Sequence, residues 1–310
     1  MKGINLYDAA PTAAISFLQQ QAAFVESEIY RVEYPQYKSN VLLDIDSSAP
    51  DWSKTVIFRA VDGSGKLKWM GENSTDVPTV DIAQSQGFHK IKTAALGYTY
   101  TLEELNYASL AGENLDAERA MVVRDTVEQG LNQIYLLGDT EAGYEGLFNG
   151  ASVPKTTAAT TIAAAIAAKT PEAIIKIFGD AYTAVYSTQT NTIHKPTVFA
   201  MPTDQYLALM QNFCNFGNAS NISYLQALKI AFPDMTFEDD INLKAAGASS
   251  KDRLVTYKKD IRVVKGHEPM GLRFMAPATA DNINFKIPAM VRSGGTEWRI
   301  PKAAHYTDGI

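Results

Sequence analysis

The sequence predicts an α+β protein in which a long two-stranded hairpin precedes one long helix. Three observations lead to this fold class. Strand-like sequence fills residues 54–100, a helical pattern covers 115–137, and helices and strands then alternate from residue 170 onward without an internal repeat. No catalytic motif interrupts residues 54–149. Such a long hairpin has few side chains with which to build a core of its own.

Composition narrows the possible function classes. The chain has 310 residues, a formal net charge of -6, 46% hydrophobic and 20% charged residues. These values indicate a folded protein and lack the basic footprint of a dedicated nucleic-acid binder. Cys214 is the only cysteine, so an intrachain disulfide is excluded. The start of the chain has no signal-peptide core, and the apolar run at 161–168 is too short to span a bilayer, so we expect a soluble cytoplasmic protein.

Residues 1–52 have the pattern of an N-terminal arm. Apolar residues recur at three- and four-residue spacing between Ala13 and Val32, which predicts a helix. An extended stretch then runs to Pro50. A helix followed by an extended tail cannot bury itself alone, so we expect the arm to lie on other parts of the protein or on a neighbouring copy.

Residues 53–100 are predicted to form the long hairpin. We expect strands at 56–61 and 66–70, separated by a turn or bulge at 62–65. The polar segment Gly71–Pro78 is expected to form the tip, and the return strand to run from Phe88 through Tyr100. Isolated two-stranded ribbons are marginally stable in water. The hairpin is therefore expected to rest on a surface outside its own chain.

A capping box at Thr101–Glu104 predicts a helix from Leu102 to about Gly112. Asn114 is the expected N-cap of the longest helix, and Gly138 is expected to end it. The apolar residues of that helix are expected to share one stripe: Leu115, Val122, Val123, Val127, Leu131, Ile134 and Leu137. A mid-stripe residue such as Leu131 should be buried against the sheet.

The second half of the chain alternates helices with strands. Residues 151–169 show no clear period and are taken as a strand-and-loop crossover. Thr170 and Pro171 predict a helix start, with Thr as the cap and Pro at the first helical position. Helices are expected from about Thr203 and Ser223. Strands are expected at 197–201, 253–258, 261–264, 272–275 and 284–287.

The sequence contains short segments that resemble catalytic or cofactor-binding motifs, but their residues do not have the spacing that such motifs require. Gly63–Lys66 lacks the spacer, the Ser or Thr and the following helix of a phosphate-binding loop. His89, His194, His267 and His305 stand apart without ligand spacing, so we expect surface or hydrogen-bonded histidines instead of a metal site. The sequence therefore predicts no enzyme, with no catalytic, metal or cofactor-binding residues and no cofactor.

Over most of its length the sequence resembles a family. It is similar to the major capsid proteins of tailed bacteriophages with the HK97 fold, and within them to the encapsulin-like group catalogued as the domain of unknown function DUF2184. The resemblance rests on the order and spacing of these segments: Phe24–Tyr30, Glu33–Pro35, Gly97–Leu105, Asn114–Asp116, Gly138–Asn149, Thr170–Ile174, Arg292–Gly295 and Pro301–Ile310.

The resemblance implies names for the parts of the chain. Residues 1–52 would be the N-terminal arm and 53–100 the extended loop. Residues 101–169 and 263–310 would form the peripheral domain with its spine helix, and 170–262 the axial domain. The resemblance also implies contacts between subunits. In the extended loop these would involve Lys66, Lys68, Trp69, Met70, Glu72 and Asp76. In the arm they would involve Phe24, Glu28, Tyr30 and Tyr34. The core of the spine helix would hold Val123, Val127, Leu131 and Ile134.

The function that the resemblance implies is structural. The chain would self-assemble into pentamers and hexamers of an icosahedral phage head around double-stranded DNA, which it would touch only non-specifically. It would be built in the host cytoplasm, would reside in the virion, and would have scaffolding, portal and decoration proteins as further partners, and no membrane. An encapsulin-type nanocompartment enclosing a cargo enzyme is the alternative. A soluble enzyme of unknown class is a third hypothesis, with no motif in its favour.

Overall fold

The chain divides into two units, residues 1–36 and 37–310. The computed structural model describes residues 37–310 except 65–68, 70–78, 105–114, 217–218 and 280–283. The predicted arm helix therefore lies outside the described residues. Every helix and strand described below belongs to the second unit.

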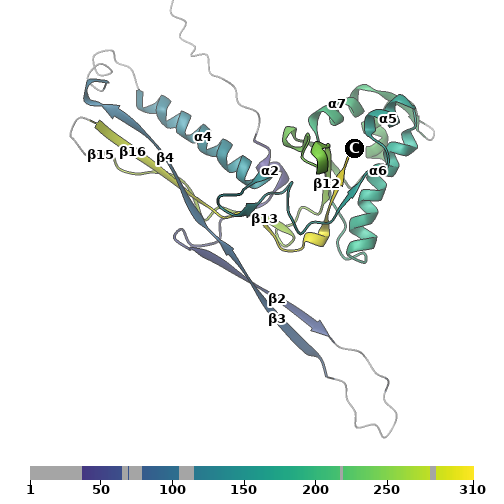
Figure 1. Ribbon diagram of the computed structural model, residues 1–310, viewed down its shortest axis with the longest axis horizontal. Helices are drawn as coiled ribbons and strands as arrows, with labels where there is room; N and C mark the ends of the chain where they lie inside the picture. The colour runs from purple at the N-terminus through teal and green to yellow at the C-terminus, as the bar shows by residue number, and fades with distance from the viewer. Residues whose placement is uncertain (1–36, 65–68, 70–78, 105–114, 217–218, 280–283) are drawn as a thin grey trace, which may run out of the picture. The chain divides into compact units, whose positions relative to one another are not determined.

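A two-stranded hairpin follows a short helix, α2 (Ser39–Leu42), and a short strand, β1 (Ile45–Asp46). Strand β2 (Thr55–Ser64) pairs antiparallel with β3 (Asp81–Lys90), from Thr55 opposite Lys90 to Ser64 opposite Asp81 (Figure 1). The turn or bulge predicted at 62–65 is wrong over its described part. Residues 62–64 continue the ladder in register, because their partners on β3 are in the same continuous strand.

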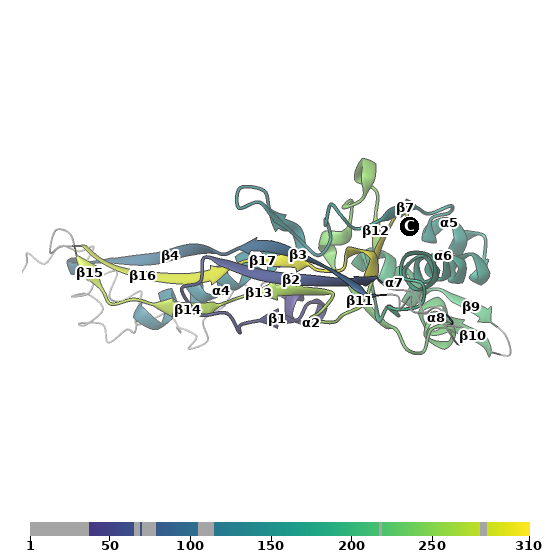
Figure 2. The same cartoon turned by 90° about the horizontal axis from the view of Figure 1, so that it is seen from below.

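The predicted return strand divides into two. Strand β3 ends at Lys90, and β4 (Lys92–Thr101) leaves the hairpin to pair antiparallel with β16 (Asn284–Ser293) along its whole length (Figure 2). Strands β14 (Met270–Phe274) and β15 (Ala278–Thr279) pair with β16 as well. The prediction that the return strand of the hairpin continues to Tyr100 is therefore wrong. Pairing β4 with β16 instead buries Tyr100 and Val291, which an isolated ribbon would leave in water.

Helix α4 (Leu115–Leu137) is the predicted spine helix and packs on β4 and β16 (Figure 1). The capping box before it forms as predicted. The Thr101 backbone N donates to Glu104 Oε2, and the Glu104 N donates to Thr101 Oγ1, both at 3.2 Å. Helical backbone follows at 102–104. Gly112 and Asn114 lie outside the described residues.

The apolar stripe of α4 is narrower than predicted. Val123 is buried and Val122 is 61% exposed, since adjacent helix residues point about 100° apart and cannot both face one sheet. Leu131 and Leu137 are half-buried against the core, whose deepest residues on this helix are Tyr135 and Leu136. The stripe therefore turns gradually around the helix toward its C-terminal end.

A five-stranded sheet forms the centre of the second half of the chain. Its strand order is β11 (Thr236–Asp239), β8 (Val198–Met201), β12 (Arg253–Tyr257), β18 (Ala304–Asp308) and β7 (Lys155–Thr157). Strand β18 is antiparallel to β12, and β7 is parallel to β18. The sheet thus unites 155–157 and 304–308 with strands of the predicted axial segment 170–262. The predicted domain limits separate these strands because β18 comes from the far end of the chain.

Apolar side chains cover both faces of this sheet. On β8, Val198 and Ala200 enter one core cluster, with Tyr135, while Phe199 and Met201 enter the other. This follows from the alternation of side chains along a strand. Four helices contribute to the second cluster: α5 (Ile162–Ala167), α6 (Pro171–Thr183), α7 (Thr203–Gln211) and α8 (Tyr224–Ala231).

The predicted strand-and-loop crossover at 151–169 contains the strand β7, but helix α5 replaces the loop at 162–167. The Thr161 side chain caps it by accepting from Ala164 N at 3.2 Å, and Ile162 and Ala165 are its buried residues. Its alanine-rich sequence hides any period. At α6, Thr170 is the N-cap residue and Pro171 opens the helix, yet the Thr170 hydroxyl donates back to Ala165 O instead of capping.

A third sheet joins β1, β13 (Val264–His267) and β17 (Gly295–Trp298). Its middle strand begins at Val264, not at Ile261 as predicted, because Asp260 O accepts from Val263 N and Val264 N in a turn. Two short ribbons complete the strands, β5 (Gly138–Asp139) with β6 (Tyr144–Glu145), and β9 (Phe213–Phe216) with β10 (Ala219–Ser223). Within the described part of the chain, no helix has the length and apolar character needed to cross a membrane.

Candidate assembly site at the hairpin and its root

The hairpin has one face that no described part of its own chain covers. Residues directly opposite each other on paired strands share a face, so Ile57 and Phe88 lie together, and Val61 and Ile82 lie on the same side further out. Their exposed fractions are 56%, 66%, 64% and 59%. We call these four residues the hairpin's apolar face. Clusters of exposed large apolar side chains are typical of interaction sites.

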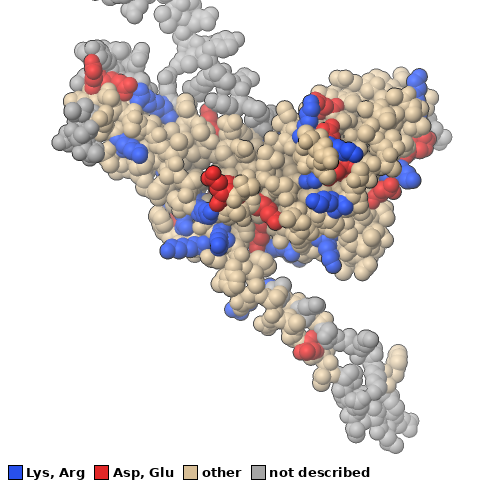
Figure 3. Space-filling model, in the orientation of Figure 1, with Lys and Arg blue, Asp and Glu red and all other residues tan. Residues whose placement is uncertain are grey.

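Charged residues are scattered along the described part of the hairpin, among them Arg59, Asp81 and Lys90. In Figure 3 the hairpin surface is mostly uncharged, whereas the rest of the chain carries scattered groups of both signs. Near the tip, Trp69 is 92% exposed and Val80 is 70% exposed. Exposed apolar side chains gathered on one face of a ribbon are suited to a partner that removes them from water.

The opposite face of the hairpin packs on the body at its root. The ring of Phe58 lies over Gly87, where an added Cβ would be 2.1 Å from Phe58 Cζ. The Arg299 guanidinium lies over the same ring, 5.7 Å from its centroid. The absence of a side chain at Gly87 therefore leaves the space that the Phe58 ring occupies. The ring in turn contacts Arg299, in the segment after β17.

Hydrogen bonds fix the backbone where the hairpin joins the body. Ile91 N donates to Lys54 O at 2.9 Å, and Ile91 is 6% exposed. The Tyr144 hydroxyl lies 3.1 Å from Lys90 O and 3.1 Å from Ser293 O. Arg292 Nη2 donates to Ser53 O at 2.9 Å. The hairpin is thus tied to the body just before β2 begins and where β3 ends.

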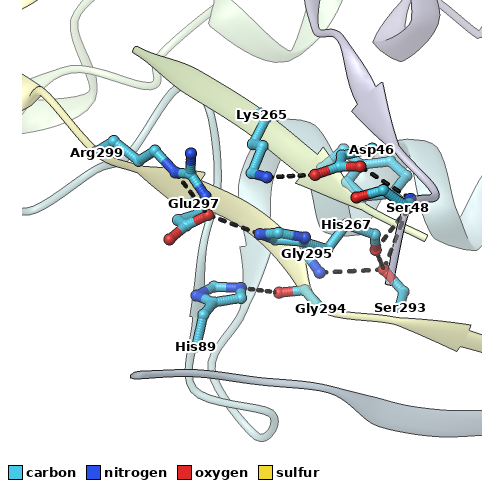
Figure 4. A network of polar contacts seen from close by, with 11 residues as sticks. Asp46, Ser48, His89, Lys265, His267, Ser293, Gly294, Gly295, Glu297 and Arg299 are labelled. Carbon is cyan, nitrogen blue, oxygen red and sulfur yellow. Dashed lines mark hydrogen bonds and ion pairs between the residues drawn. The ribbon is translucent and has the colours of Figure 1, made fainter. Parts of the chain in front are cut away.

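A polar cluster of buried and half-buried residues lies beside these bonds, and we call it the root cluster: Asp46, His89, Lys265, His267, Glu297 and Arg299 (Figure 4). His89 Nε2 donates to Gly294 O at 2.5 Å, and its ring centroid is 5.1 Å from that of His267. His267 Nε2 donates to Glu297 Oε2 at 2.7 Å, and Arg299 Nε donates to the same oxygen at 3.3 Å. Lys265 pairs with Asp46.

Burial and pairing compete for the charges of the root cluster. Burial lowers the pKa of His89 below 6.5, against the opposing effect of its hydrogen bond to Gly294. Burial alone would raise the pKa of Glu297, but the hydrogen bond from His267 and the charge of Arg299 lower it. Burial also acts to raise the pKa of Asp46, and its hydrogen bonds from Lys265 and Ser48 lower it well below 3.8. The carboxylates are therefore ionised and paired, and the neutral form of His89 is favoured.

The residues predicted for subunit contacts are only partly described. Trp69 is the described member of the extended-loop set. Lys66, Lys68, Met70, Glu72 and Asp76, and in the arm Phe24, Glu28, Tyr30 and Tyr34, lie outside the described residues. On the spine helix, Val123 is 5% exposed, while Val127, Leu131 and Ile134 line an apolar cavity of about 160 Å³ between α4 and the sheet.

Sequence reasoning missed the root cluster because its members are far apart in the chain. His89, His267 and Glu297 come from three different strands, and only the pairing of β13 with β17 brings the last two together. The one local signal is the Gly294–Gly295 pair, which allows the close approach of His89 and the positive φ of 67° at Gly295. Among the described residues, no group of three or more His, Cys, Asp or Glu side chains could hold a metal ion.

Comparisons with known proteins identify the class of structures to which this fold belongs. The capsid of Myoviridae phage XM1 matches with a TM-score of 0.79 and 17% identity over 100% of both chains. The capsid of a native GTA particle matches with a TM-score of 0.65 and 11% identity, covering 93% of this chain and 94% of that one. A virus-like particle from Pyrococcus furiosus matches with a TM-score of 0.52 and 10% identity, covering 86% and 91%. At such identities these likenesses establish the fold, and the predicted α+β, HK97-like architecture is confirmed.

A family model described as major capsid protein matches residues 65–310. The chain belongs to the major capsid protein family, and its role is structural. No curated protein sequence matches it. The predicted resemblance to phage capsid proteins is confirmed.

Proposed function

We propose that this protein is the building unit of an icosahedral phage head, in which the apolar face of the hairpin docks on a second copy of the chain. Pentamers and hexamers would form the shell around double-stranded DNA. The observation that carries the proposal is the hairpin itself, whose apolar face is uncovered by the described chain while its root is fixed by hydrogen bonds. A rigid root with an uncovered face suits contact with another subunit.

The energy available from such docking is large enough to matter. Because Ile57 and Phe88 are 56% and 66% exposed, burying the remainder of each contributes roughly 1–2 kcal/mol. The contribution repeats at every subunit of a closed shell. The DNA inside would be held by enclosure, because a net charge of -6 gives the chain no overall attraction to the phosphate backbone. Scaffolding, portal and decoration proteins, and assembly in the host cytoplasm, belong to this proposal.

Assembly of the purified chain tests the proposal. We expect shells, rings or tubes in negative-stain electron microscopy, alone or with a scaffold, and virions as the place where the protein is found. The variants Ile57→Glu and Phe88→Glu should stay folded and lose assembly, because each places a charge on the docking face. Ser85→Glu, at an exposed polar residue on the opposite face of the strand that carries Phe88, is the matched control and should assemble. A monomer that never assembles under any salt or pH would contradict the proposal.

The encapsulin-type compartment is the less favoured function. The family model that matches residues 65–310 is described as major capsid protein, which favours the phage head. Purification of particles from their natural source distinguishes the two. Nuclease-resistant DNA inside supports the head, and a co-purifying cargo enzyme supports the compartment.

A further inference from the structure

In the root cluster, the rings of His89 and His267 lie next to each other, and Glu297 is beside them. Packing alone does not require two neighbouring histidines at this contact. His89 is a hairpin residue, paired with Val56 across the ribbon. Its ring reaches out of the hairpin to Gly294 O, and 5.1 Å away lies the ring of His267 from β13 (Figure 4). The contact between hairpin and body thus includes a side chain whose charge changes near neutral pH.

We propose that His89, seated against the His267–Glu297 pair, is a proton-operated latch that holds the hairpin root to the body while neutral and releases it when protonated. The partners of His89 explain why a proton is poorly tolerated in the seated position. Glu297 already accepts from His267 at 2.7 Å and from Arg299 at 3.3 Å, so its charge is engaged. His267 itself is 1% exposed, so little water is present beside it to stabilise a positive charge on the His89 ring.

Every titratable or charged group around His89 enters the balance. On β13 these are His267 and Lys265, on β17 Glu297, and on β6 Tyr144, whose ring centroid is 6.0 Å from that of His89. Lys265 and His267 oppose a positive charge on His89, and Glu297 favours it. The Tyr144 hydroxyl is neutral near pH 7, since burial raises its pKa. The hairpin's own Lys90 is exposed and points its backbone carbonyl, not its charge, at Tyr144.

The direction of the pH effect follows from linkage. The pKa of seated His89 is lowered from 6.5, so the released form binds the proton more tightly than the seated form. Seating is therefore fully favourable above about pH 6.5, and the advantage is lost as pH falls through the lowered pKa of the seated histidine. Mild acid should loosen the root while the rest of the fold stays intact.

The space that the His89 ring occupies depends on the glycine at position 294. An added Cβ at Gly294 would be 3.2 Å from His89 Cδ2 and 3.0 Å from His267 Cβ, so Gly294 allows both rings to approach the backbone. His267 O meanwhile accepts from Gly294 N at 2.9 Å and from Ser293 Oγ at 3.2 Å. The body side of the latch is thus rigid, and His89 is the part that moves.

If the hairpin docks on a neighbour as proposed above, a released root would let the hairpin change its direction between copies. That consequence rests on the proposed function. The latch itself does not, because it is a property of the hairpin and body of one chain.

Hydrogen–deuterium exchange of the full-length chain tests the latch. Protection of the root amides in residues 54–60 and 86–91 is compared at about pH 7.5 and about pH 5, after correction for the intrinsic exchange rate. We expect wild-type protection to fall at least about tenfold in acid. His89→Gln keeps a donor for Gly294 O and cannot be protonated, so its protection should stay constant. His89→Lys carries a permanent charge and should be unprotected already at the higher pH.

His194→Gln is the control, since burial lowers the pKa of His194 as well, and it lies outside the root cluster. It should keep the wild-type response. The proposal is overturned if the wild type shows no change, or if His89→Gln responds to acid as the wild type does. Should the glutamine variant fail to fold, NMR titration of the wild-type histidines decides: a His89 pKa at or above 6.5 overturns the latch, and a lower one matching the loss of protection supports it. Electron microscopy scores shells separately, so a chain that builds no shells still reports on the latch.

Discussion

Gly138 shows how a single residue fixes the geometry where the spine helix ends. Its φ is +77°, in the left-handed region that favours glycine, and an added Cβ would be 2.4 Å from Tyr144 O and 2.7 Å from Gly146 N. The close approach lets β5 pair with β6 directly after the helix. The same segment then delivers Tyr144 to the hairpin root.

The substitution Gly138→Ala should lower the free energy of unfolding by roughly 3 kcal/mol, from backbone strain together with the clash. Gly143→Ala is the matched control. Its φ is +74°, but nothing lies within 4 Å of an added Cβ, so it should cost about 1 kcal/mol for the strain alone. Chemical denaturation of both variants measures the difference. Equal losses would show that the contact with β6 does not constrain position 138.

At this scale the sequence predicted part of the outcome. A glycine after the last periodic residue is a known helix end signal, and the reciprocal bonds of Thr101 and Glu104 are those that the capping box predicts. Both signals are local. The crowding of Gly138 by Tyr144 depends on how the following loop folds back, and no local pattern records it.

At the scale of elements, helix α4 is held mainly by its C-terminal half. Tyr135 and Leu136 are 1% and 0% exposed, whereas Leu131 is half-buried beside the cavity between the helix and the sheet. Small residues open that cavity, among them Ala94, Ala289 and Gly130. The helix therefore rests on the sheet through few large side chains at its middle.

Leu131→Asp should make the protein insoluble or strongly destabilised. A carboxylate in this apolar setting costs on the order of several kcal/mol, because neither the helix nor the sheet lining the cavity offers it a charge partner. Val122→Asp, at a 61% exposed position on the same helix, is the control and should change stability little. Expression yield and thermal melting measure both. A soluble, assembly-competent Leu131→Asp protein would mean that this part of α4 does not depend on its contact with the sheet.

Elements with strong local signals could be predicted, and those defined by distant partners could not. The bounds of α4 match the prediction at 115–137 because local end signals, an N-cap residue at 114 and a glycine at 138, mark them in the sequence. Helix α5 was missed because the alanines and isoleucines at 162–167 carry no contrast between polar and apolar residues. Strand β4 pairs with β16 instead of extending the hairpin. Because β16 lies almost two hundred residues later in the chain, a local pattern cannot identify this pairing.

At the scale of the whole molecule, the proposed function places two structural requirements on the hairpin. Its root must be fixed in the monomer, and its outer part must stay free for a neighbour. The root meets the first through Ile91, Tyr144 and the root cluster, and the exposed apolar face meets the second. The sequence predicted that a ribbon of this length needs outside support. It could not show the root cluster, because the histidines appear isolated along the chain.

Removing the end of the hairpin should separate folding from assembly. We expect that replacing residues 66–80 with a short Gly-Ser turn leaves folded, soluble subunits, because β2 ends at Ser64, β3 begins at Asp81 and every root contact lies outside the replaced segment. The change removes Trp69, which is 92% exposed and whose burial on a neighbour contributes roughly 1.5–3 kcal/mol. Because that contribution recurs at every subunit, shells should fail to close. Thermal melting and electron microscopy are measured together. Normal shells from the shortened chain would show that the tip is dispensable. A shortened chain that cannot fold would show that the hairpin end belongs to the core. The fixed root predicts a third result, an unchanged melting temperature with open or absent shells.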